Sequence, residues 1–239
     1  MEFEAIRPQL NERGFILRSG VVEEEPLQAI TAAIDAIGEE ATHARESVYA
    51  IRNPLLLAPA LAAILAASPI AALAAALFDQ PPFIVRSLYF DKPVDSNWRV
   101  PWHQDRVVAL RAHGEPKDFK AWSMKEGIPH ALAPLSLLKR MVTIRIHLDD
   151  CDAKNGALHV IPGSHKKGLL DGKDMLAFRA KHGEVICAVP RGGVMLIKPL
   201  LAHASQLANP PRHRRVLHLE FADSPPAASL EWYSQIALC

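Results

Sequence analysis

This chain of 239 residues has almost no excess of charge of either sign and few cysteines. The net charge is only +1, so composition gives no electrostatic case for nucleic acid or an anionic membrane surface. The three cysteines, Cys151, Cys187 and Cys239, lie too far apart for a zinc-binding pattern, and their odd number argues against a disulfide framework. We therefore expect no nucleic-acid or membrane partner, and a reducing, cytoplasmic location.

Targeting signals and long uninterrupted apolar runs are scarce as well. Residues 1–7 lack the basic start and apolar core of a signal peptide. Residues 55–78 are almost uncharged and long enough for a membrane span, but Pro59 and Pro69 divide them into short pieces. This run predicts short buried helices rather than a span.

The first third of the chain has a helical pattern. Acidic residues at 23–25 open a helix that we expect to reach about Glu40, since the helix dipole favours acids in the first turn. Residues 54–78 supply two further Ala-rich helices, and residues 14–17 are a candidate edge strand. Length and composition, with 49% hydrophobic and 22% charged residues, suit one domain over residues 1–239, in which 1–80 form a mainly helical cover.

From residue 83 onward the pattern changes to short strands. Branched and aromatic residues, alternating sides and turn residues predict strands at 83–90, 141–148, 157–161 and 214–221, and a hairpin formed by 185–189 and 194–197. The segment 111–138 is poorly patterned and rich in Gly and Pro, so we expect a lid loop. Helices followed by many strands indicate an α+β fold, with a jelly-roll core over 83–221 backed by the N-terminal helices.

The clearest chemical signal is Pro101-Trp102-His103-Gln104-Asp105. In an extended segment His103 and Asp105 project to the same side, while Gln104 points away or lines the rim. An imidazole and a carboxylate together suit a borderline divalent metal such as iron(II) better than magnesium or calcium. A later histidine, His203, would complete a two-histidine, one-carboxylate set, which leaves one face of the metal open.

Basic residues follow the second histidine at 212–215. An arginine is always charged and its forked guanidinium matches a carboxylate, so one of these residues could hold the far end of a dicarboxylate chelated at the metal.

The order of these motifs resembles the phytanoyl-CoA dioxygenase family. The similarity extends from about Ile51 to Phe221 and includes His103-Gln104-Asp105, Asn155-Gly156-Ala157-Leu158, the run Ile161-Pro162-Gly163-Ser164-His165, and His203-Ala204-Ser205 with Arg214. The resemblance implies a double-stranded β-helix (cupin-like) core and iron(II)- and 2-oxoglutarate-dependent dioxygenase activity. It also implies that His103, Asp105 and His203 ligate iron and that Arg214 pairs with the distal carboxylate of 2-oxoglutarate.

The resemblance implies further cosubstrate contacts. By their position relative to the family's motifs, these are Gln104, Ser205, Trp122, Leu88 and Arg52. The segment between Asp105 and Met141 does not resemble a particular member, so an acyl-CoA substrate is not carried over.

Strand alternation bears on the substrate. Thr143, Arg145 and His147 share one face of their strand, and Arg214, His218 and Glu220 share a face of the last strand. Polar faces that line the barrel near iron would suit a small anionic or amphipathic molecule. Trp98, Trp102 and Trp122 would cover its apolar part, with the 111–138 loop closing over it. We expect hydroxylation of this substrate by dioxygen, with release of succinate and carbon dioxide; the oligomeric state is left open.

Several of these residues also have a purely structural interpretation. We expect surface or core roles for His43, His113, His130, His182 and His213, a loop-fixing role for His165 and a surface ion pair for Arg215. Retention of Asp105 argues against a halogenase. The alternative from another class is a non-catalytic jelly-roll module that binds a metal and a small molecule. An arginine that anchors a carboxylate favours the enzyme, because a structural metal site needs none.

Overall fold

The computed structural model describes residues 5–37, 43–45, 48–92, 98–114, 116–209 and 213–238. Side chains at 43–49 lie outside the described part, so the expectation for His43 lies outside it as well. The helix that was expected to reach about Glu40 ends earlier, at Asp35, and residues 36 and 37 form a turn. None of the helices in these ranges is long and apolar enough to cross a membrane.

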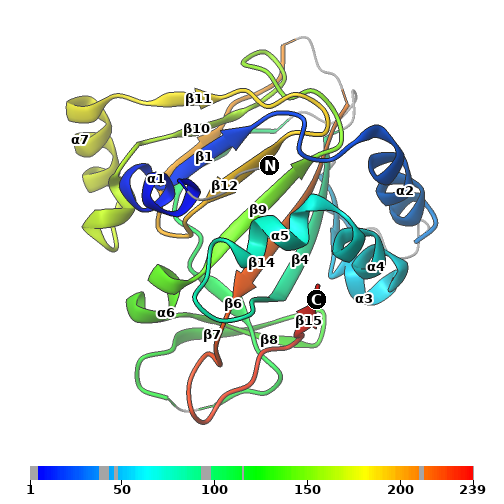
Figure 1. Cartoon of the computed structure of the whole chain (residues 1–239). Coiled ribbons are helices and arrows are strands. Elements are labelled where there is room, and N and C mark those ends of the chain that lie inside the picture. Colours follow the sequence, from blue (N-terminus) through cyan, green and yellow to red (C-terminus); the bar gives the residue numbers. More distant parts are fainter. Residues whose placement is uncertain are drawn as a thin grey trace.

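The first third is helical with one edge strand, as expected, and it also contains a short strand pair that the sequence did not predict (Figure 1). Its elements are α1 (Ile6–Arg13), β1 (Phe15–Arg18), α2 (Glu24–Asp35), β2 (His43–Arg45), β3 (Val48–Arg52), α3 (Pro54–Leu57), α4 (Ala60–Ala67) and α5 (Pro69–Ala75). The apolar run therefore makes three short helices rather than two. Pro54 and Pro69 each occupy the start of a helix, where a missing N–H costs nothing.

The rest of the chain consists mainly of strands. In order they are β4 (Phe83–Lys92), β5 (Val100–His103), β6 (Val107–Ala109), β7 (Lys120–Lys125), β8 (Ile128–Leu132), β9 (Val142–His147), β10 (Leu158–Val160), β11 (Val185–Cys187), β12 (Val194–Ile197), β13 (His203–Ser205), β14 (Arg214–Ala222) and β15 (Ile236–Ala237). Two helices, α6 (Leu135–Arg140) and α7 (Gly172–His182), and the 3-10 turn η2 (Ser164–Lys167) connect them.

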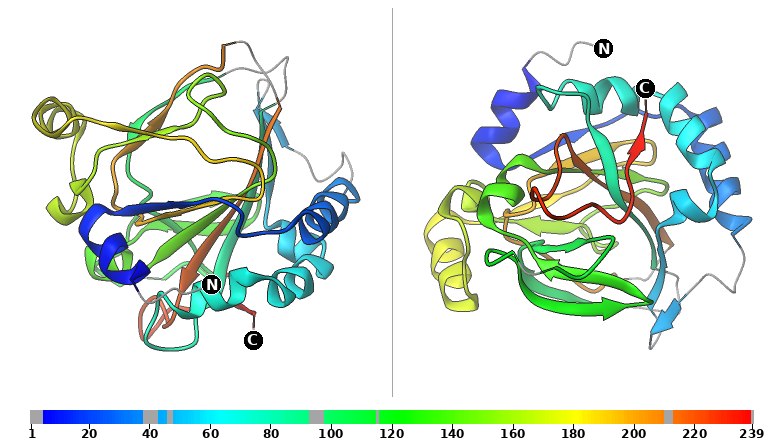
Figure 2. Two further views of the ribbon diagram at one scale, coloured as in Figure 1. Left: turned by 45° about the horizontal axis from the view of Figure 1, so that its top comes forward. Right: turned by 90° about the horizontal axis from the view of Figure 1, so that it is seen from below.

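Two antiparallel sheets face each other as a jelly roll (Figures 1 and 2). The larger sheet has the order β1-β12-β9-β14-β4-β3-β2, with β15 also paired to β4, and the smaller has the order β11-β10-β13-β5. The outer face of the larger sheet carries Ile144, Ile146, Leu217 and Leu219, which pack in one core cluster with residues of α1, α2, α4 and α5. The helices therefore bury the aliphatic face, and the polar face of β9 and β14 is turned toward the smaller sheet.

The expected hairpin of 185–189 and 194–197 is wrong. β11 pairs with β10 in the smaller sheet, whereas β12 pairs with β1 and β9 in the larger one. The chain crosses between the sheets at 190–193, where Gly192 has a φ of 74° and a Cβ on Gly193 would lie 2.9 Å from the Arg18 carbonyl oxygen. A turn pattern marks the reversal of the chain but not the strand that pairs with it.

The expected lid loop at 111–138 is also wrong. β7 and β8 form a hairpin in a three-stranded sheet with β6 (Figure 2, right), and α6 begins before residue 138. The hairpin turns at Glu126 and Gly127, both with positive φ (54° and 75°), the backbone of a tight two-residue turn. Glu-Gly is a weak signal for such a turn and Pro129 argues against a strand, so the sequence pattern hid the hairpin.

Candidate active site

The metal-ligand candidates come from two paired strands of the smaller sheet. His103 ends β5 and His203 begins β13, and the two are register partners across the antiparallel pair. Asp105 follows β5, and its backbone N–H donates to the Pro199 carbonyl oxygen at 2.9 Å. This pairing brings together residues that lie a hundred positions apart in sequence.

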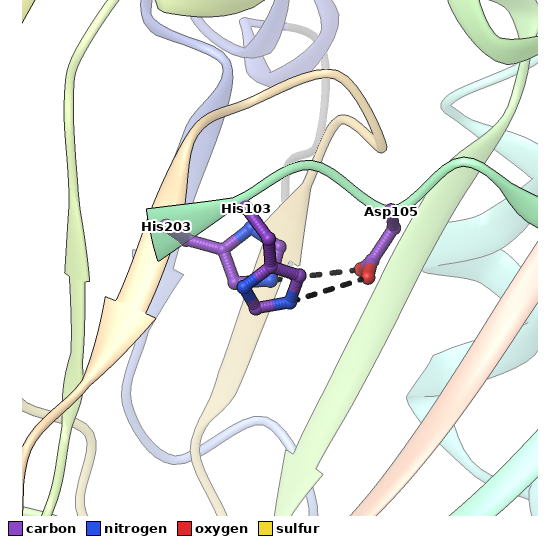
Figure 3. Close-up of side chains that lie close together, drawn as sticks. All are labelled: His103, Asp105 and His203. Atoms are coloured by element: carbon purple, nitrogen blue, oxygen red, sulfur yellow. Dashed lines mark ion pairs between the residues drawn. The ribbon is translucent and has the colours of Figure 1, made fainter. Parts of the chain in front are cut away.

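The three side chains converge (Figure 3). The Nε2 atoms of His103 and His203 each lie 3.7 Å from a different carboxylate oxygen of Asp105, and one ligand atom from each residue falls within 4.8 Å of the others. Atoms around one ion have this spacing, since each would lie about 2 Å from the metal.

Hydrogen bonds fix the tautomer of both imidazoles. Nδ1 of His103 donates to the Pro101 carbonyl oxygen at 2.8 Å, and Nδ1 of His203 donates to the Leu201 carbonyl oxygen at 2.9 Å. A carbonyl can only accept, so the proton is on Nδ1 and the lone pair of Nε2 is available to a metal. The donor set therefore fits a first-row divalent metal such as iron(II).

Burial and charge favour the metal-binding protonation states. Burial lowers the pKa of His203 to about 4, which keeps the ring neutral and able to ligate. Burial alone would raise the pKa of Asp105, but in the acid range where a carboxyl titrates the protonated His203 ring and the charge of Arg86 attract the carboxylate and hold this pKa below its usual value. The carboxylate is therefore ionised.

A cavity of about 370 Å³ opens beside this cluster, between the two sheets. Its charged and polar lining comes mainly from the larger sheet: Arg52, Arg86, Arg145, Arg214, His218 and Glu220, with His103, Asp105, His203 and Ser205 opposite. Its apolar lining is Ala50, Leu88, Phe90, Trp98, Val100 and Leu158. The prediction that the polar face of β9 and β14 lines the interior is confirmed for Arg145, Arg214, His218 and Glu220.

The family-type motifs position this cavity's residues. Arg214 begins β14, and its Nη1 donates to the Gly156 carbonyl oxygen. Asn155 Nδ2 donates to the His213 carbonyl oxygen at 3.2 Å, which ties the same turn to the start of β14. Ser164 Oγ accepts from the N–H of Ala202 at 2.9 Å, so the Pro-Gly-Ser-His run supports the strand that carries His203.

Some predicted cosubstrate contacts do not reach the cavity. Trp122 lies against His113 and Phe119, with ring centroids 4.3 and 6.4 Å away, in the cluster around β6 and β8. Trp102 faces α7, where the Arg179 guanidinium lies 5.4 Å from its ring. Of the three tryptophans that were expected to cover the apolar part of the substrate, only Trp98 lines the cavity. Spacing across the 111–138 segment could not place Trp122, because that segment folds as a separate hairpin.

Gln104 also points away from the cavity. Its Nε2 donates to the carbonyl oxygens of Gly168 (2.8 Å) and Leu200 (2.7 Å), and its Oε1 accepts from the N–H of Leu170 at 3.0 Å. Both donors of this amide and its oxygen bond backbone groups, so its place is structural. It joins the metal-binding segment to the turn between β12 and β13 and to the loop before α7.

Replacing Gln104 by alanine is therefore expected to lower the free energy of unfolding by about 3 kcal/mol, because it leaves buried backbone groups unpaired at about 1–3 kcal/mol each. The 2-oxoglutarate affinity should stay within about threefold of wild type, or roughly 0.7 kcal/mol. Urea denaturation and calorimetry measure the two quantities. Gln28→Ala on the surface of α2 is the control and should change stability by less than about 0.5 kcal/mol. A large loss of cosubstrate affinity at unchanged stability would contradict this placement.

Sequence analysis missed Arg86. Its Nη1 lies 3.0 Å from Glu220 Oε1, its cross-strand register partner in the cavity lining. His218 lies 3.5 Å from the same oxygen. Alternation along 83–90 would have put Arg86 on the face of Leu88, but no motif marked it. The structural expectations for other residues hold: Arg215 pairs with Asp149 at 2.8 Å, and His165 bonds the Asn11 carbonyl oxygen at 3.0 Å.

Comparison with known proteins agrees with this geometry. The family model described as phytanoyl-CoA dioxygenase matches residues 10–216. A search of curated proteins found no match. Among solved structures, EctD from S. alaskensis in its apoform shows a TM-score of 0.68 at 19% identity, covering 91% of this chain and 75% of its own. SnoK, a non-heme alpha ketoglutarate dependent carbocyclase from nogalamycin biosynthesis, shows a TM-score of 0.71 at 19% identity, and the match covers 96% of this chain and 88% of SnoK. AviO1 from Streptomyces viridochromogenes Tue57 shows a TM-score of 0.65 at 21% identity, and the match covers 94% of this chain and 97% of AviO1.

Proposed function

Because the chain belongs to the phytanoyl-CoA dioxygenase family and is an iron(II)- and 2-oxoglutarate-dependent oxygenase, we propose that it hydroxylates a small anionic or amphipathic molecule. His103, Asp105 and His203 would hold the iron, and Arg214 would receive the distal carboxylate of 2-oxoglutarate. One observation carries the proposal: the three ligand candidates and Arg214 line the same cavity. A non-catalytic module, the alternative from the sequence, is set aside by the family assignment.

The bound iron and 2-oxoglutarate would supply the activation of dioxygen, with succinate and carbon dioxide as products. The chain's own residues orient the reactants. The neutral Nε2 atoms of His103 and His203 and the ionised carboxylate of Asp105 would hold the iron, and the cavity that they line would take the cosubstrate and the substrate. Ser205, Leu88 and Arg52 line the cavity and are the further cosubstrate contacts that the resemblance implies.

Cavity size limits the substrate. A volume of about 370 Å³ is near the lower end for ligand sites and must also contain the cosubstrate. Only a small molecule can be enclosed, so an acyl-CoA is not expected inside. Phe90, Trp98 and Leu158 offer apolar contact to a hydrocarbon part.

Cavity charge suggests an acidic group on the substrate. Four arginines and two carboxylates line it, which gives 4 − 2 = +2. The charges of iron(II) and of the 2-oxoglutarate dianion cancel each other. Glu126, which pairs with Arg52 at 2.7 Å, lowers the remainder to +1. A substrate with one carboxylate or phosphate would neutralise it.

Small carboxylic acids are therefore expected to raise succinate formation above the background without substrate, while their primary amides of equal size do not. The measurement is a screen of acid and amide pairs, such as hexanoate with hexanamide, at saturating iron and 2-oxoglutarate. Stimulation by neutral or cationic compounds alone would contradict an acidic substrate, and stimulation by no compound of the cavity's size would count against hydroxylation of a small molecule.

A further inference from the structure

Two arginines in the cavity carry buried charge and have no carboxylate partner among the residues that the structure describes. Arg145 and Arg214 are only 7% and 6% exposed. Arg145 Nη1 bonds His218 Nδ1 at 2.9 Å and Arg214 Nη1 bonds a backbone carbonyl, yet the Nε of each is buried without a hydrogen-bond partner. A guanidinium has five N–H donors, and a buried charge is costly without an opposite charge. This pair is therefore built to receive an anion.

The other two arginines of the cavity differ from this pair. Arg86 lies 3.0 Å from Glu220, and Arg52 lies 2.7 Å from Glu126 at the tip of the β7–β8 hairpin. Each already has a carboxylate. The strongest demand for an anion therefore falls on Arg145 and Arg214.

These two guanidiniums lie close enough to act on each other. Arg145 is the register partner of His218 across β9 and β14, and Arg214 lies four residues before His218 on the same face of β14. Burial and then the charge of Arg214 lower the pKa of Arg145 to about 10. His147 lies on the same face of β9 as Arg145. Burial and the charges of both arginines lower the pKa of His147 to about 3, so its ring is neutral and adds no third charge.

Arg145 also lies near the metal-ligand cluster. The charge of Asp105 acts on Arg145, and that of Arg145 acts on His203. Arg145 therefore lines the same cavity as Asp105, His203 and Arg214, within range of the charges on all three.

We propose that Arg145 and Arg214 together hold the distal carboxylate of 2-oxoglutarate, with one guanidinium on each oxygen and His218 as the positioning residue for Arg145. This inference rests on the proposed function, in which Arg214 receives the cosubstrate. Two like charges that repel each other are both stabilised by one shared carboxylate. Strand alternation alone had assigned Arg145 to a substrate anion; its nearness to Arg214 assigns it to the cosubstrate.

The test compares 2-oxoglutarate with 2-oxopentanoate, which keeps the chelating 2-oxo acid but has a methyl group in place of the distal carboxylate. Calorimetry on the iron-loaded protein under nitrogen gives the Kd of each ligand. Arg145→Met is expected to raise the Kd of 2-oxoglutarate by about tenfold or more, while the Kd of 2-oxopentanoate changes by less than about threefold. Arg145→Lys should recover part of the loss, and Arg215→Met, next in sequence but paired with Asp149, is the matched control.

The positioning role of His218 has its own comparison. His218→Asn keeps an oxygen near the place of Nδ1 and should preserve the 2-oxoglutarate affinity, whereas His218→Phe should weaken it. Neither should change the affinity for 2-oxopentanoate. An equal loss for both ligands would indicate general damage to the cavity and overturn the positioning role.

The outcomes separate this inference from the proposed function. Suppose that Arg214→Met weakens the binding of 2-oxoglutarate more than that of 2-oxopentanoate and that Arg145→Met does not. The proposal of a shared carboxylate is then overturned while the proposed function stands. If neither variant weakens it, the proposed cosubstrate site fails as well. Equal loss of both ligands in Arg145→Met also overturns the inference. Should Arg145→Met fail to fold, the selective weakening of 2-oxoglutarate in Arg145→Lys decides the question.

Discussion

Replacing His203 by alanine is expected to weaken iron(II) binding by more than about 100-fold, because even substitutions outside the ligand set cost about 10–100-fold in metal affinity. His203 is 5% exposed, and its Nδ1–H donates to the Leu201 carbonyl oxygen. In this buried place we expect no other side chain to supply a ligand atom when the imidazole is removed. Equilibrium dialysis under nitrogen measures the loss. The same loss is expected for His103→Ala.

A control variant and a test of folding make this result interpretable. His182→Ala removes an exposed imidazole on α7 that stacks on Phe178, and it should bind iron as the wild type does. Circular dichroism of each variant confirms that the fold is retained. One metal ion per chain bound by a correctly folded His203→Ala protein with unchanged affinity would show that the metal lies elsewhere.

Replacing Arg214 by alanine is expected to raise the Kd of 2-oxoglutarate by roughly 30-fold or more, since losing one partner of a buried charged pair costs about 2–5 kcal/mol. Iron affinity should change little, because Arg214 is outside the ligand set. Calorimetry under nitrogen measures the first quantity and dialysis the second.

Arg215→Ala provides the matched control. Arg215 alternates to the opposite face of β14, pairs with Asp149 at 2.8 Å and is partly exposed, so its loss should leave the cosubstrate affinity unchanged. Arg214→Ala with wild-type affinity for 2-oxoglutarate would remove the anchor from the proposal. Equal weakening in both variants would indicate a general loss of positive charge instead of a specific contact.

The sequence by itself determined the features that depend on local pattern. Alternation along 142–148 and 214–221 separated the aliphatic face from the face with Arg145 and Arg214, because a strand reverses side-chain direction at every residue. The His-x-Asp spacing placed His103 and Asp105 on one side for the same reason. Proline positions likewise divided the apolar run at 55–78 into short helices.

Only the tertiary structure decided which distant segments meet. The pairing of β5 with β13 joined His103 to His203, and the pairing of β4 with β14 joined Arg86 to Glu220. It also showed that Gln104 binds backbone groups and that Trp122 packs with a separate hairpin. Side-chain direction repeats every two residues and is readable locally, whereas strand partners are selected by burial across the whole chain. Arg145 and Arg214 lie on two strands, β9 and β14, that only the fold brings together, so the proposal of a shared anion depends on the tertiary structure.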